Sequence, residues 1–323
     1  MNSYVLCVRD LNRDNRFSTG LDKPRYLAVP PGAGEPLPAH AMPDVNGWMT
    51  AVLQDAKSSA DPKTGLEVVF FEHGYNTDPV EALKRQRLVE NELNTRGFKC
   101  LVIGFDWPTG GTAAAYLYDR LQAQQAALIL VEGGIIPFAQ FQRADCPIGV
   151  HVMAHSMGAF VVREAFRATD KSHNGDVGSD WKVGQIVFFG ADVSSSCFDT
   201  DSPDMQPVFA HCGRLTNYFS GYDEALAVSN VKNMDISSRV GRVGMPTRTP
   251  GDAKAVDVDC GPRYQAIPDR KFQVISGMVS HSWYLEDARW YEDLAYTLKG
   301  DLDRNLIPTR NKVGENDFVL KVN

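Results

Sequence analysis

The sequence of 323 residues lacks the features that mark membrane, repeat and nucleic-acid-binding proteins. No run of about 18 apolar residues occurs, which argues against a membrane span. The 33 basic and 40 acidic residues give a net charge of −7, and no long basic run appears, so no nucleic-acid partner is expected. There is neither an internal repeat nor a low-complexity linker. Apolar residues at 43% and charged residues at 23% then predict an ordinary globular protein.

Cysteine is also scarce, and no two cysteines form a CxxC pair. The six residues are Cys7, Cys100, Cys146, Cys197, Cys212 and Cys260. This pattern favours free thiols in a reducing compartment, although the even number leaves one or more bridges open. Residues 1–9 lack a basic segment followed by a long apolar one, so no signal peptide is expected and a cytoplasmic location is predicted.

The sequence does contain buried-strand patterns that alternate with helical ones. Strands are expected at 4–8, 25–29, 66–71, 100–105, 148–154, 185–190, 214–219 and 272–279. Near-continuous apolar strands between helices predict an α/β fold with a mostly parallel sheet covered by helices on both faces. The first two strands, which polar residues separate, are expected to be antiparallel.

Helix signals support this pattern. Asp78, Pro79 and Glu81 form an expected N-terminal cap, first helical residue and capping box, and Gly97 is the expected stop. Further helices are expected within 112–140, over 160–168 and at the end of the fold. The last has Tyr284, Ala288, Tyr291, Ala295 and Leu298 on one face and ends at Gly300.

The functional signals lie from about residue 70 to residue 281, so residues 1–323 are predicted to be a single domain with its core at about 60–300. The N-terminal strands and a surface excursion at 231–270 are elaborations, and 30–44 is a loop rich in Pro and Gly. The short gap at 193–213 predicts no large cap domain. Residues 128–138 are expected either to line an acyl pocket or to form a buried helix.

The sharpest chemical signal is AHSMG at 154–158, directly after an expected buried strand and before a helix. A serine with small residues two positions away on each side, at a tight strand-to-helix turn, is typical of a nucleophile elbow. Here the serine is Ser156, and the N–H of Met157 is expected to face a developing oxyanion. The alternative is a serine N-cap followed by a packing glycine.

A second signal is HGYN at 73–76, which follows an earlier strand. An oxyanion hole needs a second N–H donor opposite the elbow. In folds that carry a nucleophile elbow, this donor comes from the loop after the third strand. The N–H of Tyr75 is the candidate. The alternative is a plain turn capped by Asn76 or Asp78.

A serine nucleophile needs a base, and His281 is well placed because it precedes the closing helix. His173 and His211 lie in poorly placed segments. His151 and His155 are four residues apart but lack the glutamate of HExxH, so no metal site is expected there. His155 is expected to pack beside the elbow.

The base needs a carboxylate. Two aspartates follow buried strands: Asp192 after 185–190 and Asp223 after 214–219. The acid usually follows the second strand after the elbow, which favours Asp223. Asp192, which follows the first, remains its rival.

Together these residues resemble the α/β-hydrolase superfamily over roughly 60–300. They are most similar to a bacterial group of esterase- and lipase-like α/β-hydrolases of unknown function, which shows HGYN, AHSMG, an aspartate near Asp192 and further short motifs. Those further motifs are here Trp107-Pro108, the S-x-x-D-x-A-L pattern at 220–226 and the pair His281-Ser282.

The resemblance implies a triad of Ser156, His281 and Asp223, an oxyanion hole from Tyr75 and Met157, an acyl-enzyme intermediate, and no cofactor or metal. The function expected is a carboxylesterase that cleaves small-molecule esters with short- to medium-chain acyl groups. A lipase, phospholipase, thioesterase or amidase of the same mechanism stays open, as does a catalytically silent hydrolase-like binding protein.

Overall fold

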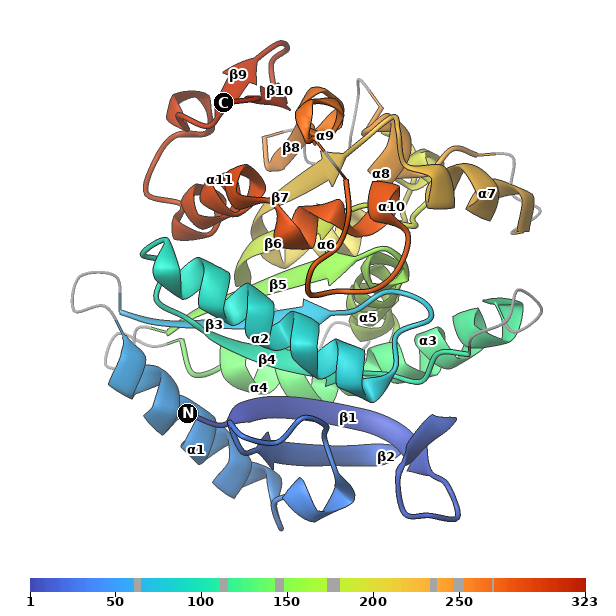
Figure 1. Cartoon of the computed structure of the whole chain (residues 1–323), viewed down its shortest axis with the longest axis vertical. Coiled ribbons are helices and arrows are strands. Elements are labelled where there is room, and N and C mark those ends of the chain that lie inside the picture. The colour runs from blue at the N-terminus through green and yellow to red at the C-terminus, as the bar shows by residue number, and fades with distance from the viewer. Residues whose placement is uncertain are drawn as a thin grey trace.

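The computed structural model describes residues 1–60, 65–110, 116–142, 148–172, 181–232, 237–246, 253–268 and 270–323. Within them ten strands form one sheet in the order β2-β1-β4-β3-β5-β6-β7-β8-β10-β9 (Figure 1). The strands are β1 (Ser3–Leu11), β2 (Phe17–Val29), β3 (Leu66–Glu72), β4 (Leu101–Asp106), β5 (Ile148–His155), β6 (Val183–Phe189), β7 (Cys212–Phe219), β8 (Ala255–Asp259), β9 (Arg310–Lys312) and β10 (Asp317–Leu320). The β1–β2 and β9–β10 pairs are antiparallel, and the other neighbouring pairs are parallel.

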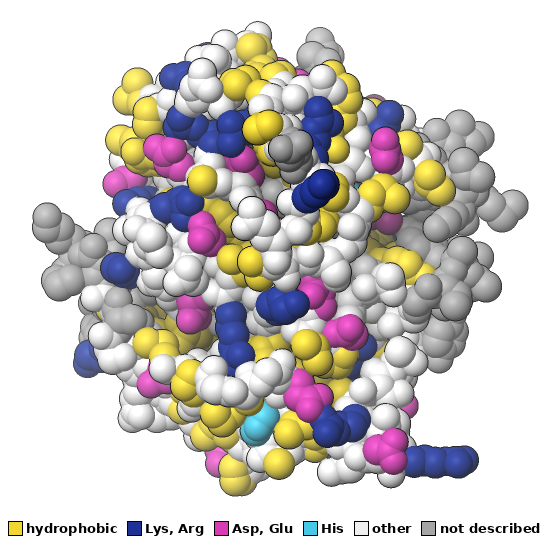
Figure 2. All heavy atoms as spheres, in the orientation of Figure 1, with side chains coloured by type: hydrophobic (Ala, Val, Ile, Leu, Met, Phe, Trp, Pro, Cys, Tyr) yellow, Lys and Arg dark blue, Asp and Glu magenta, His cyan; other side chains and the backbone are white. Residues whose placement is uncertain are grey.

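Helices cover both faces of this sheet, as expected. They are α1 (Val45–Ser59), α2 (Pro79–Thr95), α3 (Tyr116–Leu130), α4 (Ile136–Ala139), α5 (Met157–Ser172), α6 (Gln206–Ala210), α7 (Glu224–Lys232), α8 (Val240–Val243), α9 (Gly261–Ala266), α10 (Val279–Ser282) and α11 (Ala288–Lys299). Helices α1, α3, α4, α5 and α6 share one core with the sheet, while α2, α9 and α11 share the core of the other face. Figure 2 shows charged side chains of both signs mixed over the outer surface on the side of α2 and α11.

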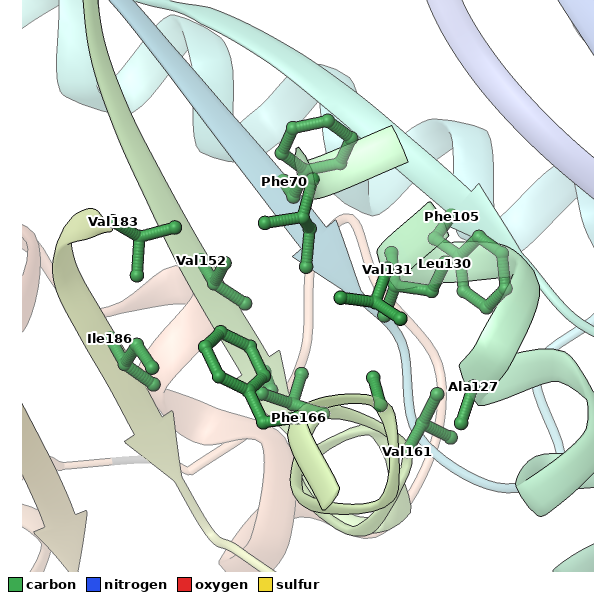
Figure 3. Packing of buried hydrophobic residues seen from close by; sticks show 14 of the residues in the cluster. Phe70, Phe105, Ala127, Leu130, Val131, Val152, Val161, Phe166, Val183 and Ile186 are labelled. Atoms are coloured by element: carbon green, nitrogen blue, oxygen red, sulfur yellow. The ribbon is translucent and has the colours of Figure 1, made fainter. Parts of the chain in front are cut away.

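The larger core shows why the apolar runs form strands. Phe70 of β3 and Val152 of β5 are fully buried and project toward the helical layer, where Val131 and Phe166 lie (Figure 3). Burying a side chain of this size contributes about 1.5–3 kcal/mol. Residues 128–138 form helical structure that packs into this core and includes a π-helical turn at Val131–Ile135, so the helical alternative is confirmed. The alternative that they line an acyl pocket stays a prediction.

Helix α2 begins as the sequence predicts. The Asp78 side chain accepts a hydrogen bond from the backbone N–H of Glu81, and Pro79 is the first helical residue. The expected capping box is wrong in one respect, because the Glu81 carboxylate binds Arg85 and the backbone N–H of Ser276 instead of the cap. The helix ends before Gly97, whose φ of +78° suits glycine.

The expected last strand at 272–279 is wrong: residues 272–278 form a loop, and α10 follows. Gly277 has a φ of +116°, which an extended strand does not allow. The actual strand before the closing elements is β8, inside the segment that was expected to be a surface excursion. Buried Val256 and Val258 of β8 alternate with Asp257 and Asp259, so the sequence shows no continuous apolar run there.

The segment 231–270 therefore contributes α8, β8 and α9 to the fold. Strands β9 and β10 after residue 300 were not expected; β10 pairs in parallel with β8. Tyr284 lies in a 3-10 turn (Trp283–Glu286), and α11 begins only at Ala288, where Asp287 caps it.

The segment between β6 and β7 holds only a 3-10 turn (Ser195–Phe198) and α6, in agreement with the expected absence of a large lid. Five cysteines are buried free thiols. Cys146 and His173 lie outside the described residues. Among the described helices, none has the length and apolar character that crossing a bilayer requires.

Candidate active site

Ser156 lies on a strained turn between β5 and α5. Its φ is +56°, a conformation that costs a residue with a side chain about 1–3 kcal/mol. The turn is tight, because a Cβ atom at Gly158 would lie 2.7 Å from the carbonyl oxygen of Glu72. Backbone hydrogen bonds from Ser156 N–H to Phe189 (3.2 Å) and from Asp192 N–H to the Ser156 carbonyl (2.9 Å) hold it in place. This is the geometry of a nucleophile elbow.

The HGYN segment lies directly against this turn. A Cβ atom at Gly74 would lie only 2.8 Å from the Cβ atom of Ser156, so only glycine allows so close an approach. Asn76 has a φ of +54°, which turns the chain toward α2. The structure thus brings Tyr75 and Ser156 to the same edge of the sheet, where strands β3 and β5 end.

A buried network of ring stacking, hydrogen bonds and an ion pair holds the HGYN segment in place. The His73 ring stacks on Trp107 with centroids 5.4 Å apart, and the Trp107 indole N–H donates to the His73 carbonyl at 3.2 Å. Arg9 of β1 donates to Asp106 at 2.6 Å and to the carbonyl of Thr77 at 2.8 Å. Burial lowers the pKa of His73. Burial raises the pKa of Asp106, but the Arg9 charge and the His73 hydrogen bond outweigh it and hold the pKa below the ordinary value.

His281 lies on α10 and contacts one of the two candidate acids. Its Nδ1 lies 2.7 Å from Oδ2 of Asp223, which is fully buried in the loop after β7. The other oxygen of Asp223 accepts from the backbone N–H of Leu226 at 2.9 Å. The rival, Asp192, instead forms an ion pair with buried Arg239 at 3.2 Å.

The charges around His281 favour its protonated form. Burial by itself lowers the pKa of His281, but the charge and hydrogen bond of Asp223 outweigh it, and Asp192 adds to this effect. Arg85 opposes it. The net result is a pKa above the ordinary value, so an imidazolium at this position is stabilised.

A glycine lets the histidine approach the elbow. Gly190, directly after β6, has a φ of +53°, and a Cβ atom there would lie 3.3 Å from Cε1 of His281. The preceding residue, Phe189, accepts the hydrogen bond from Ser156 N–H. Ser156 and His281 therefore both contact the turn after β6.

The family to which this chain belongs can be identified from residues 50–294, which match the model described as alpha/beta hydrolase of unknown function (DUF900). The chain belongs to this family. The parallel strand order β4-β3-β5-β6-β7-β8, with helices on both faces, is the α/β-hydrolase architecture that the motifs predicted.

Solved structures resemble this hydrolase only distantly. A cutinase-like protein from Cryptococcus sp. has 10% identity and a TM-score of 0.32, with 72% of this chain and 92% of that chain covered. The RedJ thioesterase of the prodiginine biosynthetic pathway in Streptomyces coelicolor has 13% identity and a TM-score of 0.34, with 75% and 88% covered. No curated protein matches.

Histidines outside this site have structural partners. His151 Nε2 lies 2.9 Å from the Glu67 carboxylate, and its Nδ1 accepts from the backbone N–H of Gln185. His211 stacks on Trp181. Among the described residues, no cluster of three or more His, Cys, Asp or Glu side chains is arranged to hold a metal ion.

Sequence reasoning missed the residues that support the hydrolase site from a distance. Glu286 accepts the backbone N–H groups of Gln273, Val274 and Ile275, and so fixes the loop that precedes His281. Arg9 had one detectable signal, since it is a lone cation at the end of the apolar run 4–8. Glu286 had none, because the donors that bind it are backbone N–H groups of a segment that was expected to be a strand.

Proposed function

We propose that this hydrolase is a carboxylesterase that cleaves short- to medium-chain acyl esters with a triad of Ser156, His281 and Asp223. The observation that carries the proposal is the 2.7 Å contact between His281 Nδ1 and buried Asp223 beside the strained serine turn. A carboxylate at Nδ1 leaves Nε2 as the nitrogen that accepts the serine proton. The cytoplasmic location expected from the sequence stays a prediction.

The proposed reaction has two halves. Ser156 Oγ attacks the ester carbonyl while His281 takes its proton, and the imidazolium then protonates the departing alcohol. Water next attacks the acyl-enzyme with His281 as base, which releases the acid and regenerates Ser156. The backbone N–H groups of Tyr75 and Met157 are the proposed oxyanion donors. Met157 is the first residue of α5, where a helix N-terminus favours negative charge.

The short segment between β6 and β7 favours small esters. It holds no large helical cap, so we propose an open entrance that does not enclose a long acyl chain. A series of p-nitrophenyl esters from two to twelve carbons should therefore show the highest kcat/KM at the short end. Maximal turnover of the longest esters would instead favour a lipase.

The nucleophile is tested by a fluorophosphonate that labels activated serines. We expect one equivalent to attach to Ser156, as located by mass spectrometry of the digested protein. Ser156→Ala should lose both the label and the turnover, while Ser58→Ala, a change at an exposed serine at the end of α1, should lose neither. A folded wild-type protein without label or ester turnover would leave the silent binding protein as the better description.

A further inference from the structure

His155, the residue before the elbow serine, contacts the segments that carry two other parts of the proposed site. Its side chain is almost fully buried, at 2% exposure. Its ring lies against that of His281, with centroids 4.6 Å apart and planes tilted by 42°, and it stacks on Phe189 at 4.9 Å. Its Nδ1 lies 3.1 Å from where a Cβ atom at Gly74 would be, so the HGYN segment packs against the same ring.

The contact with His281 defines the tautomer of His155. Nε2 lies 3.1 Å from the backbone carbonyl oxygen of His281. A carbonyl oxygen only accepts, so Nε2 carries the proton and donates. Nδ1 has no hydrogen-bond partner in the described part of the chain. A neutral ring with its proton on Nε2 satisfies this arrangement, because a proton on Nδ1 would be a buried donor without an acceptor.

The surroundings keep this ring neutral. Burial lowers the pKa of His155 well below its ordinary value, and the positive charges of His281, Arg85 and, more weakly, His73 act in the same direction. The hydrogen bond to the His281 carbonyl opposes them without prevailing. His281 can therefore become an imidazolium 4.6 Å away without meeting a second positive ring.

We propose that His155 is a positioning residue that holds the imidazole of His281 in its working orientation, through one hydrogen bond to the His281 backbone and one ring contact. The proposal rests on the proposed function, because it assigns His281 the role of base. Helix α10 has only four residues, so it offers little internal restraint on that orientation. His155 supplies a restraint from β5, a strand in the middle of the sheet.

Two substitutions separate the hydrogen bond from the ring. His155→Phe keeps an aromatic ring but loses the donor, whereas His155→Gln places an amide N–H near the position of Nε2. We expect His155→Phe to lower kcat by about 10- to 100-fold with KM little changed, because a misplaced base weakens the transition state more than substrate binding. His155→Gln should recover most of kcat. His151→Gln, a change at a second buried histidine of β5 that contacts Glu67, is the matched control and should leave kcat unchanged.

A readout independent of turnover is the titration of the His281 ring, followed by NMR of histidine-labelled protein. Loss of the restraint should loosen the contact with Asp223, so the His281 midpoint should fall in His155→Phe and return in His155→Gln. A folded His155→Phe protein with the wild-type midpoint and kcat would overturn the proposal. A His155→Phe protein that loses thermal stability but keeps the wild-type kcat and His281 midpoint would overturn it as well. If His155→Phe does not fold, His155→Asn, whose shorter side chain does not reach the carbonyl, replaces it.

The two proposals fail in different ways. A wild-type protein that neither hydrolyses esters nor reacts with the fluorophosphonate, but whose His281 midpoint still falls in His155→Phe, would refute the esterase and retain the positioning. An active wild-type enzyme whose His281 midpoint is unchanged by His155→Phe would retain the esterase and refute the positioning role of His155.

Discussion

At the scale of single residues, the two candidate acids differ in what they contact. Asp223 binds the ring of His281, whereas Asp192 pairs with Arg239, and both are buried. We expect Asp223→Asn to lower kcat by about 10⁴-fold, because an amide neither fixes the tautomer nor balances the imidazolium. Asp192→Asn should instead destabilise the fold by about 3 kcal/mol, because it leaves a buried arginine without its counter-charge.

Ester turnover and urea unfolding of both variants give the comparison. A larger loss of kcat in Asp192→Asn would assign the acid role to Asp192.

The pKa of His281 predicts where activity begins. A base works only when it is neutral, and Asp223 holds the pKa of His281 above its ordinary value of about 6.5. The rise of kcat/KM with pH should therefore have its midpoint above pH 6.5 rather than at it. Initial rates from pH 5 to 9 test this, with Ser156→Ala as the blank for spontaneous ester hydrolysis. A flat profile, or a midpoint at or below 6.5, would contradict it.

Glu72 is a buried carboxyl group that the proposed chemistry does not use. It lies at the end of β3 with no exposed surface, and neither carboxyl oxygen has a hydrogen-bond partner within the part of the chain that the structure describes. Burial raises its pKa well above the ordinary value, so the folded protein keeps it protonated. Stability from this group is fully present below the unfolded pKa of about 4.3, and it is lost as pH rises from there toward the folded pKa.

Glu72→Met removes this dependence, so its gain in stability over wild type should grow from pH 5 to pH 8, to about 1–3 kcal/mol. Urea unfolding at the two values measures it, with Glu315→Met at an exposed site as the control. An equal effect at both values of pH would show that Glu72 is not held protonated.

At the scale of elements, the sequence predicted the buried strands that consist of continuous apolar runs. Phe70 and Val152 are examples, since both faces of β3 and β5 are covered. The sequence did not predict strand β8, because Asp257 interrupts its apolar run. The side chain of Asp257 is satisfied by Asn217 and by the backbone N–H of Met245, partners that only the folded chain brings together.

The opposite error occurred at 272–279. Its apolar residues resemble a strand, yet Val274 and Met278 are about half exposed, at 47% and 48%. The backbone N–H groups of this loop bind carboxylates of Glu81 and Glu286 rather than a neighbouring strand. Residue order nevertheless led to His281 as the candidate base, because that prediction depends on its place before the closing helix and not on the structure of the segment that leads to it.

The loop that leads to His281 should depend on Glu286. Glu286→Gln leaves one oxygen to accept from three backbone N–H groups, so we expect hydrogen exchange in 272–278 to become at least tenfold faster. Ester turnover should fall several-fold as His281 becomes less well placed. Glu292→Gln on α11 removes only a partly exposed ion pair and should change neither. Unchanged exchange in Glu286→Gln would show that other contacts hold the loop.

At the scale of the whole molecule, both ends of the chain lie outside the matched residues 50–294 and yet enter the sheet. Each end inserts a buried arginine. Arg9 binds Asp106, and Arg310 binds Asp293 of α11 at 3.0 Å. We therefore propose that residues 1–323 fold as one domain, which one continuous sheet from β2 to β9 supports. The span of the motifs predicted a single domain, but the sequence could not predict these two arginine contacts, because an isolated arginine carries no signal of its partner.

Arg9 connects the N-terminal strand to the proposed oxyanion segment, and its loss should therefore affect both stability and rate. Arg9→Met leaves Asp106 buried without its guanidinium, which should cost about 3–5 kcal/mol. It also removes the hydrogen bond to the Thr77 carbonyl, so kcat should fall even at temperatures where the variant is fully folded. Arg289→Met, at a partly exposed pair with Glu292, should cost less than about 1 kcal/mol and leave kcat unchanged. If Arg9→Met lost stability but kept kcat, the N-terminal strand would support the sheet without positioning the HGYN segment.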